Sequence, residues 1–413
     1  MIFNYALEFD KTFDQAWATP SGNNYDNKVE DAADEKVYFA LSVVDRIVQC
    51  MGTEVCENEL KMILDNFLQK SWEHQYFAFY VLGSYSGFDQ EISKVEKIFD
   101  ILFKSTESPE AKLRFSAIHC INNFCDNYNP SFQNQTIKVL IPLLEKLLKS
   151  ETVLRNQCEI LSALISFMQF TTSEALKPYV QELFELLFTL FKQGNIPIII
   201  RKLVLEAILE IISTMEEQIS PLAPVSFDII SKYFFECYNN KSNQILYGAL
   251  IECITSLGIY VKEKYHPIVP QILNCIMEII KGFESDKAEP IRADLTNSLD
   301  RLLPVLQENF KNLLPSLIDV VLTLIKMRPQ MSISSSPSEQ FDVNKLLNEN
   351  DDEDDKMKGK EILTSETEDL ASSLSLLNTI IQSIGDEFLP YVDKVEAEVV
   401  QFLSYKADPK IRI

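Results

Sequence analysis

The residues best suited to catalysis or metal binding are few and widely separated. The three histidines, His74, His119 and His266, lie far apart in the 413-residue sequence. A histidine-based metal site or a hydrolytic triad is therefore poorly supplied. The sequence also contains no Walker loop, no GxSxG motif and no HExxH motif. We therefore expect a protein that is not an enzyme and that requires no cofactor.

Cysteine spacing gives the same answer. No pair of cysteines has the CxxC spacing of zinc or redox sites, and several cysteines interrupt apolar helical stretches. Metal or redox chemistry remains the alternative, but buried free thiols in a reducing compartment are favoured. The N-terminus resembles no signal peptide, and no apolar run could cross a bilayer, so we expect a soluble intracellular protein. The cysteines are Cys50, Cys56, Cys120, Cys125, Cys158, Cys237, Cys253 and Cys275.

The acidic balance of the chain points to a class of partner. Thirty-eight Lys and Arg residues stand against 61 Asp and Glu residues, so the formal net charge is −23. Nucleic-acid backbones require basic surfaces, and we expect no direct nucleic-acid binding. A strongly acidic surface instead attracts and steers basic partners.

The elements that position these charges are helices in a repeat. Apolar residues follow helical spacing almost everywhere, for example at Leu183, Leu187 and Phe191. A proline after a short apolar segment recurs with gaps of 46, 46, 45 and 75 residues. Proline suits the first turn of a helix because its missing N–H has no intrahelical partner there. The five prolines are Pro178, Pro224, Pro270, Pro315 and Pro390.

Arginines form a second landmark in the repeat. Arg155, Arg201 and Arg292 each precede their proline by 23 residues, and Arg114 precedes the matching Gln135 by 21. Tyr247 and Thr367 take this place in two other repeats. The arginines could form a structural ladder between repeats or a ligand site, and the ladder is favoured because solenoid interfaces repeat. Arg412 takes the same place near the end of the chain.

This period predicts the architecture. Units of about 40–47 residues with two helices are typical of HEAT repeats. We expect an all-α, right-handed HEAT-repeat solenoid over residues 1–413, with about eight antiparallel pairs of A and B helices. Polar or acidic insertions are expected at 18–35 and 328–362, the second Ser-rich, disordered and free to contact a basic partner. Because the sequence stops shortly after a new A helix opens, we interpret it as part of a longer solenoid.

Several stretches resemble one family in colinear order. Trp17-Ala18 precedes an insertion, Ala40–Ile47 is similar to the family's Ala-Leu-Asp-Arg helix, and Ser71–His74 takes the place of an Asp-Trp pair. The Ser108–Asp126 helix and Leu250–Gly258, the best local match, follow. Arg301–Leu314 and the acidic run 349–355 complete the order. The chain thus resembles the importin-beta (karyopherin-beta) nuclear transport receptors, most closely the karyopherin beta-3 (importin-5) subfamily, although Trp72-Glu73-His74-Gln75 lacks the family's arginine.

The resemblance implies a nuclear import receptor that shuttles between cytoplasm and nucleus through the nuclear pore. Such receptors bind cargo with basic localisation signals, including ribosomal and histone-like proteins, on their concave B-helix side. The resemblance also implies release by GTP-bound Ran, which binds mainly through repeats outside this sequence, and nucleoporins as further partners. It implies no insertion into membranes.

Helical periodicity identifies candidate cargo-binding side chains. On the B helix after Pro178, Glu182 and Glu185 lie opposite the apolar positions, and the repeat places other carboxylates near the same face. Such carboxylates could accept Lys and Arg side chains, while Trp72 and Tyr238 could stack on them. For each acid a merely solvated helix face is the alternative. The other candidates are Asp100, Glu145, Asp228, Glu278 and Asp319.

A second function stays open at this point. A HEAT-repeat scaffold, of the phosphatase type or associated with chromosomes, would share the helical repeat. Phosphatase-type scaffolds have shorter and more uniform repeats than the 42–46 residues found here, and they lack a long acidic insertion. The sequence therefore favours the transport receptor.

Overall fold

The structure of this chain is a computed structural model that describes residues 15–19, 39–40, 42–44, 46–47, 50, 66–86, 92–281, 289–306, 310–326 and 364–400. Within these ranges the regular elements are all helices, which confirms the predicted all-α class. The chain divides into two compact units, residues 1–221 and 222–413.

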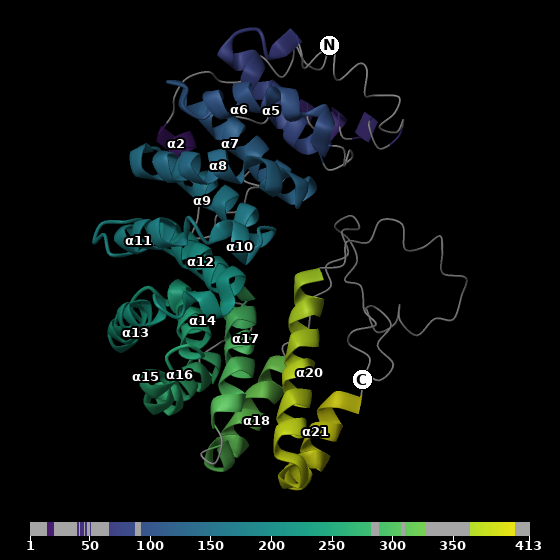
Figure 1. Ribbon diagram of the computed structural model, residues 1–413. Helices are drawn as coiled ribbons and strands as arrows, with labels where there is room; N and C mark the ends of the chain where they lie inside the picture. The colour runs from purple at the N-terminus through teal and green to yellow at the C-terminus, as the bar shows by residue number, and fades with distance from the viewer. Residues whose placement is uncertain are drawn as a thin grey trace, which may run out of the picture. The chain divides into compact units, whose positions relative to one another are not determined.

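The first unit is a stack of helices (Figure 1). The A helices α5, α7, α9 and α12 lie side by side in this order, and each packs against the next. The B helix α8 packs against α7 and α9, and α11 packs against α12. The elements are α2 (Gln15–Ala18), α5 (Trp72–Ser86), η1 (Ile92–Lys94), η2 (Glu96–Ile98), α6 (Phe99–Ser105), α7 (Ala111–Asn127), α8 (Ser131–Ser150), α9 (Leu154–Gln169), α10 (Ser173–Leu176), α11 (Val180–Phe191), α12 (Ile198–Met215) and η3 (Glu216–Ile219).

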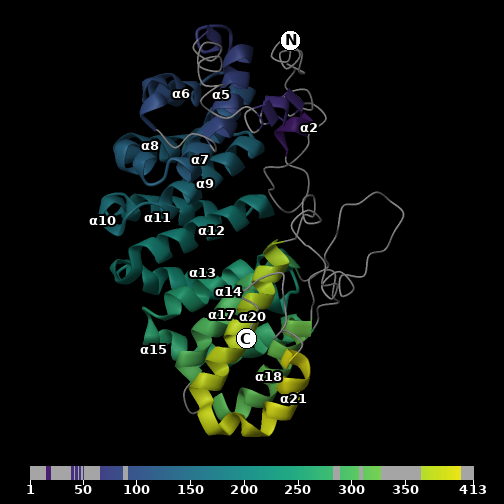
Figure 2. The ribbon, with the colours of Figure 1, turned by 90° about the vertical axis from the view of Figure 1, so that its right-hand side faces the viewer.

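The second unit follows the same plan. Its A helices α14, α17 and α20 pack side by side in this order (Figure 2), and α16 and α18 are B helices that contact each other (Figure 1). The elements are α13 (Ala223–Asn239), η4 (Gln244–Leu246), α14 (Tyr247–Gly258), α15 (Lys262–Tyr265), η5 (His266–Ile268), α16 (Val269–Lys281), α17 (Glu289–Leu306), α18 (Phe310–Lys326), α20 (Thr364–Ile384), η7 (Gly385–Tyr391) and α21 (Val392–Val399).

The two kinds of helix differ in how much of their surface they bury. The A helix α14 buries every one of its 12 residues except Glu252. The B helix α11 buries only one face, at Val180, Leu183, Phe184, Leu187, Phe188 and Phe191. A helices are therefore covered on several sides, whereas each B helix leaves one face for solvent or a partner.

Four of the five repeat prolines stand at the start of a B helix, as predicted. The helices begin at Val180, Ala223, Val269 and Val392, next to Pro178, Pro224, Pro270 and Pro390. The prediction is wrong for Pro315, because α18 already begins at Phe310 and contains Pro315 within it. Pro315 is exposed, so water can reach the carbonyl that its ring leaves without an amide donor.

Other predictions meet the structure only in part. Of the described cysteines, six are buried free thiols, but Cys50 is exposed, so its predicted burial is wrong. No three His, Cys, Asp or Glu side chains in the described ranges could hold a metal ion. The helices searched in those ranges include none that is both long and apolar enough to cross a bilayer. Cys56, the side chain of Arg292, Arg412 and nearly all of the 18–35 and 328–362 insertions lie outside the described residues.

Candidate functional site

The seven predicted carboxylates of the B helices, called here the B-helix carboxylates, do not share one environment. In the first unit Asp100 on α6 and Glu182 and Glu185 on α11 are exposed, as the periodicity predicts. Glu145 on α8 is only 6% exposed, so its predicted place on a solvent face is wrong. Leu144 and Leu148 of the same helix are buried too, which places Glu145 at the edge of the packed side of α8.

The environment of Glu145 is unusual for a carboxylate. Its Oε1 atom is buried and has no hydrogen-bond partner. Burial raises the pKa of the Glu145 carboxyl; the neighbouring Glu182 carboxylate raises it further, while Lys149 lowers it. Lys149 also pairs with Glu182, with 3.3 Å between Nζ and Oε1. Glu145, Lys149 and Glu182 therefore form one charged group between α8 and α11.

The second unit holds the remaining B-helix carboxylates, all of them exposed. Asp228 on α13 pairs with Lys264 on α15 at 2.5 Å between Oδ2 and Nζ. Asp319 on α18 pairs with Lys394 on α21. Glu278 on α16 accepts a 2.5 Å hydrogen bond from the Tyr238 hydroxyl of α13. Each contact joins elements of consecutive repeats.

The two aromatic candidates lie in different places. Trp72 is the first residue of the A helix α5 and is partly buried. Tyr238 lies near the end of the B helix α13, where its ring centroid is 5.8 Å from that of Tyr247. Burial and the hydrogen bond to the Glu278 carboxylate raise the pKa of the Tyr238 hydroxyl. Tyr238 thus directly contacts a B-helix carboxylate.

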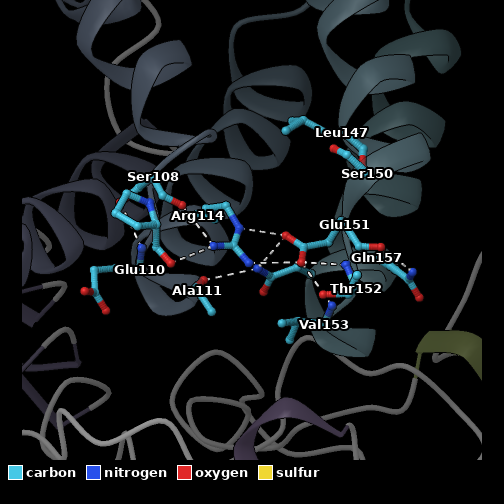
Figure 3. A network of polar contacts seen from close by, with 12 residues as sticks. Ser108, Glu110, Ala111, Arg114, Leu147, Ser150, Glu151, Thr152, Val153 and Gln157 are labelled. Atoms are coloured by element: carbon cyan, nitrogen blue, oxygen red, sulfur yellow. Dashed lines mark hydrogen bonds and ion pairs between the residues drawn. The ribbon is translucent and has the colours of Figure 1, made fainter.

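Arg114 occupies the best-defined ladder position. It forms two hydrogen bonds with Glu151, from Nε to Oε2 at 2.8 Å and from Nη2 to Oε1 at 3.0 Å (Figure 3). Its Nη1 atom donates to the carbonyls of Ser108 and Pro109. Arg114 thus joins the turn before α7 to the turn before α9, which are equivalent turns of consecutive repeats (Figure 3).

Glu151 is held from its other side as well. The backbone N–H groups of Thr152 and Val153 donate to Oε1, and the amide of Asn156 donates to Oε2. Burial alone would raise the pKa of the Glu151 carboxyl, but these hydrogen bonds and the Arg114 charge leave it below its ordinary value. The ion pair is therefore fixed by its surroundings as well as by charge.

Two other ladder positions, Arg201 and Tyr247, share one contact type. Arg201 donates from Nη2 to the carbonyl of Gln193 at 2.8 Å, and the Tyr247 hydroxyl donates to the carbonyl of Cys237 at 3.1 Å. With Arg114, these side chains satisfy carbonyls at or just beyond the end of the preceding B helix, which lack donors within the helix. Arg155 differs, because its Nε donates to the Trp17 carbonyl at 2.6 Å and its guanidinium lies 5.3 Å from the Trp17 ring centre.

The partners of these charges were not predicted from the sequence. Glu151 lies 37 residues after Arg114, a separation slightly shorter than one repeat period, and this spacing could have indicated the pair. The lysines that meet the B-helix carboxylates, Lys149, Lys264 and Lys394, have no common spacing from their partners, and no sequence signal would have found them.

Comparisons with known proteins agree with the fold. No family model matches the chain. The chain is 23% identical over 380 residues to importin subunit beta-3 of Saccharomyces cerevisiae, which covers 89% of this chain and 34% of that protein. It therefore spans about a third of that relative's length.

Solved structures show the same helical architecture. The crystal structure of Kap121p matches 100% of this chain and 39% of its own chain, at 21% identity and a TM-score of 0.74. Kap121p bound to Pho4p and Kap121p bound to Nup53p cover the same shares, each with a TM-score of 0.75, at 21% and 20% identity. The predicted HEAT-repeat solenoid is thereby confirmed as the fold.

Proposed function

We propose that this chain is part of a nuclear import receptor of the importin-beta family and that its repeats bind basic cargo. The relative named importin subunit beta-3 and the structure of Kap121p bound to Pho4p support this proposal. The cargo would carry Lys- and Arg-rich localisation signals.

One observation supports this role most directly. Successive B helices present carboxylates at corresponding places, with Glu182 on α11, Asp228 on α13 and Asp319 on α18 exposed to solvent. Charge-assisted hydrogen bonds from Lys and Arg would satisfy such carboxylates.

The energetics require many contacts. An exposed ion pair contributes only about 0–1 kcal/mol, so no single carboxylate would hold a cargo. Several carboxylates along a repeat would add their contributions, and the net charge of −23 would steer a basic segment toward the protein. Binding should therefore weaken as salt increases.

The remaining parts of the proposal concern partners and location. Kap121p has been solved bound to Nup53p, which supports nucleoporins as partners of this chain. We further propose that GTP-bound Ran regulates cargo release and that the protein shuttles between cytoplasm and nucleus through the nuclear pore.

The test is a titration of the 413-residue chain with a fluorescent Lys- and Arg-rich peptide at several salt concentrations. We expect the triple variant Glu182→Lys, Glu185→Lys and Asp228→Lys to bind about tenfold more weakly or worse, because three contacts are lost and replaced by repulsion. The matched control is Glu174→Lys, Glu216→Lys and Glu217→Lys, which changes the net charge equally at exposed sites in the turns between A and B helices.

The two variants separate the outcomes. If both weaken binding equally, long-range charge alone attracts the peptide and the B-helix carboxylates are not the site. Absence of binding at low salt, both for the unchanged chain and for a variant without Lys149 and Lys264, would contradict the proposed function of these repeats.

A further inference from the structure

Three of the seven predicted cargo-binding carboxylates already pair with cations of the protein itself. Glu182 pairs with Lys149 of the preceding B helix. Asp228 pairs with Lys264 and Asp319 with Lys394, each lysine belonging to the next element pair along the chain. A basic cargo would meet occupied carboxylates in both units.

The charged group of Glu145, Lys149 and Glu182, between α8 and α11, shows most fully how an internal lysine meets these carboxylates. Lys149 bonds Glu182 and also lowers the pKa of Glu145, so its ammonium acts on both carboxylates. Even so, Oε1 of the buried Glu145 has no hydrogen-bond donor. Lys149 thus neutralises part of this charge while leaving acceptor capacity unused.

These lysines are held weakly enough to leave. Lys149 and Glu182 are 49% and 68% exposed, and Lys264 and Asp228 are 47% and 58% exposed. Half-exposed single pairs of this kind contribute little to stability. By contrast, the side chain of Glu151 in the Arg114 pair is only 3% exposed and accepts three further hydrogen bonds, from Thr152, Val153 and Asn156.

We propose that Lys149, Lys264 and Lys394 are internal competitors that occupy the B-helix carboxylates until a basic cargo side chain displaces them. This inference rests on the proposed function and adds a device that sets cargo affinity. A cargo with one basic residue gains almost nothing by exchanging with an internal lysine. A cargo with several Lys and Arg residues can displace a lysine at each carboxylate that it reaches, and it gains from its own connectivity. The internal lysines therefore reject weakly basic segments.

The experiment removes one competitor at a time from the full chain. Lys149→Met and Lys264→Met keep the length of the side chain and remove its charge. Their matched controls are Lys138→Met on α8, which forms no ion pair among the described residues, and Lys232→Met on α13, whose partner Glu236 lies on its own helix. Affinity for the fluorescent Lys- and Arg-rich peptide is measured at one fixed salt concentration, with thermal unfolding as a check on folding.

We expect Lys149→Met and Lys264→Met each to bind the peptide about two- to fivefold more tightly than their controls. The double variant should gain approximately the product of the two factors, because the sites lie in different units. Comparison with the controls removes the general effect of losing one positive charge.

Three other results have distinct meanings. If the unchanged chain binds and the B-helix variants weaken it, but the lysine variants only match their controls, the inference is wrong and the proposed function stands. If only the lysine variants bind, both are supported, because the lysines then block the site. If neither the unchanged chain nor the double lysine variant binds at low salt, both proposals are overturned.

Discussion

Two sets of ion pairs join consecutive repeats of this protein, and they differ in burial. The Arg114–Glu151 pair at the turns is bidentate, and Glu151 is also bonded by backbone and Asn156 donors. The Lys149–Glu182 pair on the B helices is a single contact of 3.3 Å between two half-exposed side chains. The first type therefore fixes the stacking of repeats, whereas the second leaves charges that a ligand can take over.

The largest effect should come from breaking the turn pair. Glu151→Ala leaves the Arg114 guanidinium without its carboxylate and removes the acceptor for Thr152, Val153 and Asn156. We expect the first unit to lose about 2–4 kcal/mol of stability. Urea unfolding followed by tryptophan fluorescence measures this directly, because both tryptophans, Trp17 and Trp72, belong to the first unit.

The matched control for this variant is Glu182→Ala. It removes a carboxylate of the other set, and we expect a change below about 0.5 kcal/mol. Equal losses for the two variants would show that burial does not separate the two sets of pairs.

A smaller loss of stability is expected at Tyr247, a ladder position whose side chain carries no charge. Tyr247 is buried and donates its hydroxyl to the Cys237 carbonyl at 3.1 Å. Tyr247→Phe keeps the ring and leaves that carbonyl without this donor, which should cost about 1 kcal/mol. Hydrogen exchange of the amides in α13 and α14 would report the loss. Unchanged protection would mean that this contact does not stabilise the junction.

The pH dependence of the two buried glutamates should have opposite signs. The pKa of Glu151 is lowered in the folded protein, so its stabilising effect is present above the ordinary glutamate pKa of about 4.3 and is lost as pH falls through the lowered value. The pKa of Glu145 is raised, chiefly by burial, so its ionised form destabilises the fold. Stability associated with Glu145 therefore increases as pH falls through its raised pKa.

Amide substitutions separate the two effects. Glu145→Gln should raise the free energy of unfolding of the first unit at neutral pH by up to about 1 kcal/mol, which is measured as a higher urea midpoint. It should leave unfolding in acid unchanged. Glu151→Gln should lower the midpoint at neutral pH and flatten its decline in acid. A lower neutral midpoint for Glu145→Gln would show that the Glu145 carboxylate stabilises the fold.

The sequence predicted the repeated part of the fold more fully than the charged contacts. Periodic apolar residues and the prolines at 178, 224, 270 and 390 located the B helices, because each repeat buries its apolar face against its neighbours in the same way. The prediction that a B helix begins at Pro315 was wrong, since a proline within a helix is tolerated where it is exposed.

The charged contacts could not be predicted because they depend on helix rotation and side-chain reach. The repeat predicted Glu145 near the same helix face as Glu182, but one is buried and the other exposed. Glu145 lies ten residues after Gln135 whereas Glu182 lies four after the matching Pro178, so the two side chains do not take equivalent places around their helices. The role of the B-helix carboxylates as a cargo site stays a prediction.

The smallest effect on stability should come from substitution of the internal lysines. Lys149→Met removes one half-exposed pair with Glu182 and should change the unfolding free energy of the first unit by less than about 0.5 kcal/mol. The same substitution is expected to raise peptide affinity two- to fivefold. A side chain that matters for binding but not for folding belongs to the replaceable set. If Lys149→Met instead destabilised the unit as strongly as Glu151→Ala, the B-helix pairs would be part of the repeat interface and could not serve as displaceable competitors.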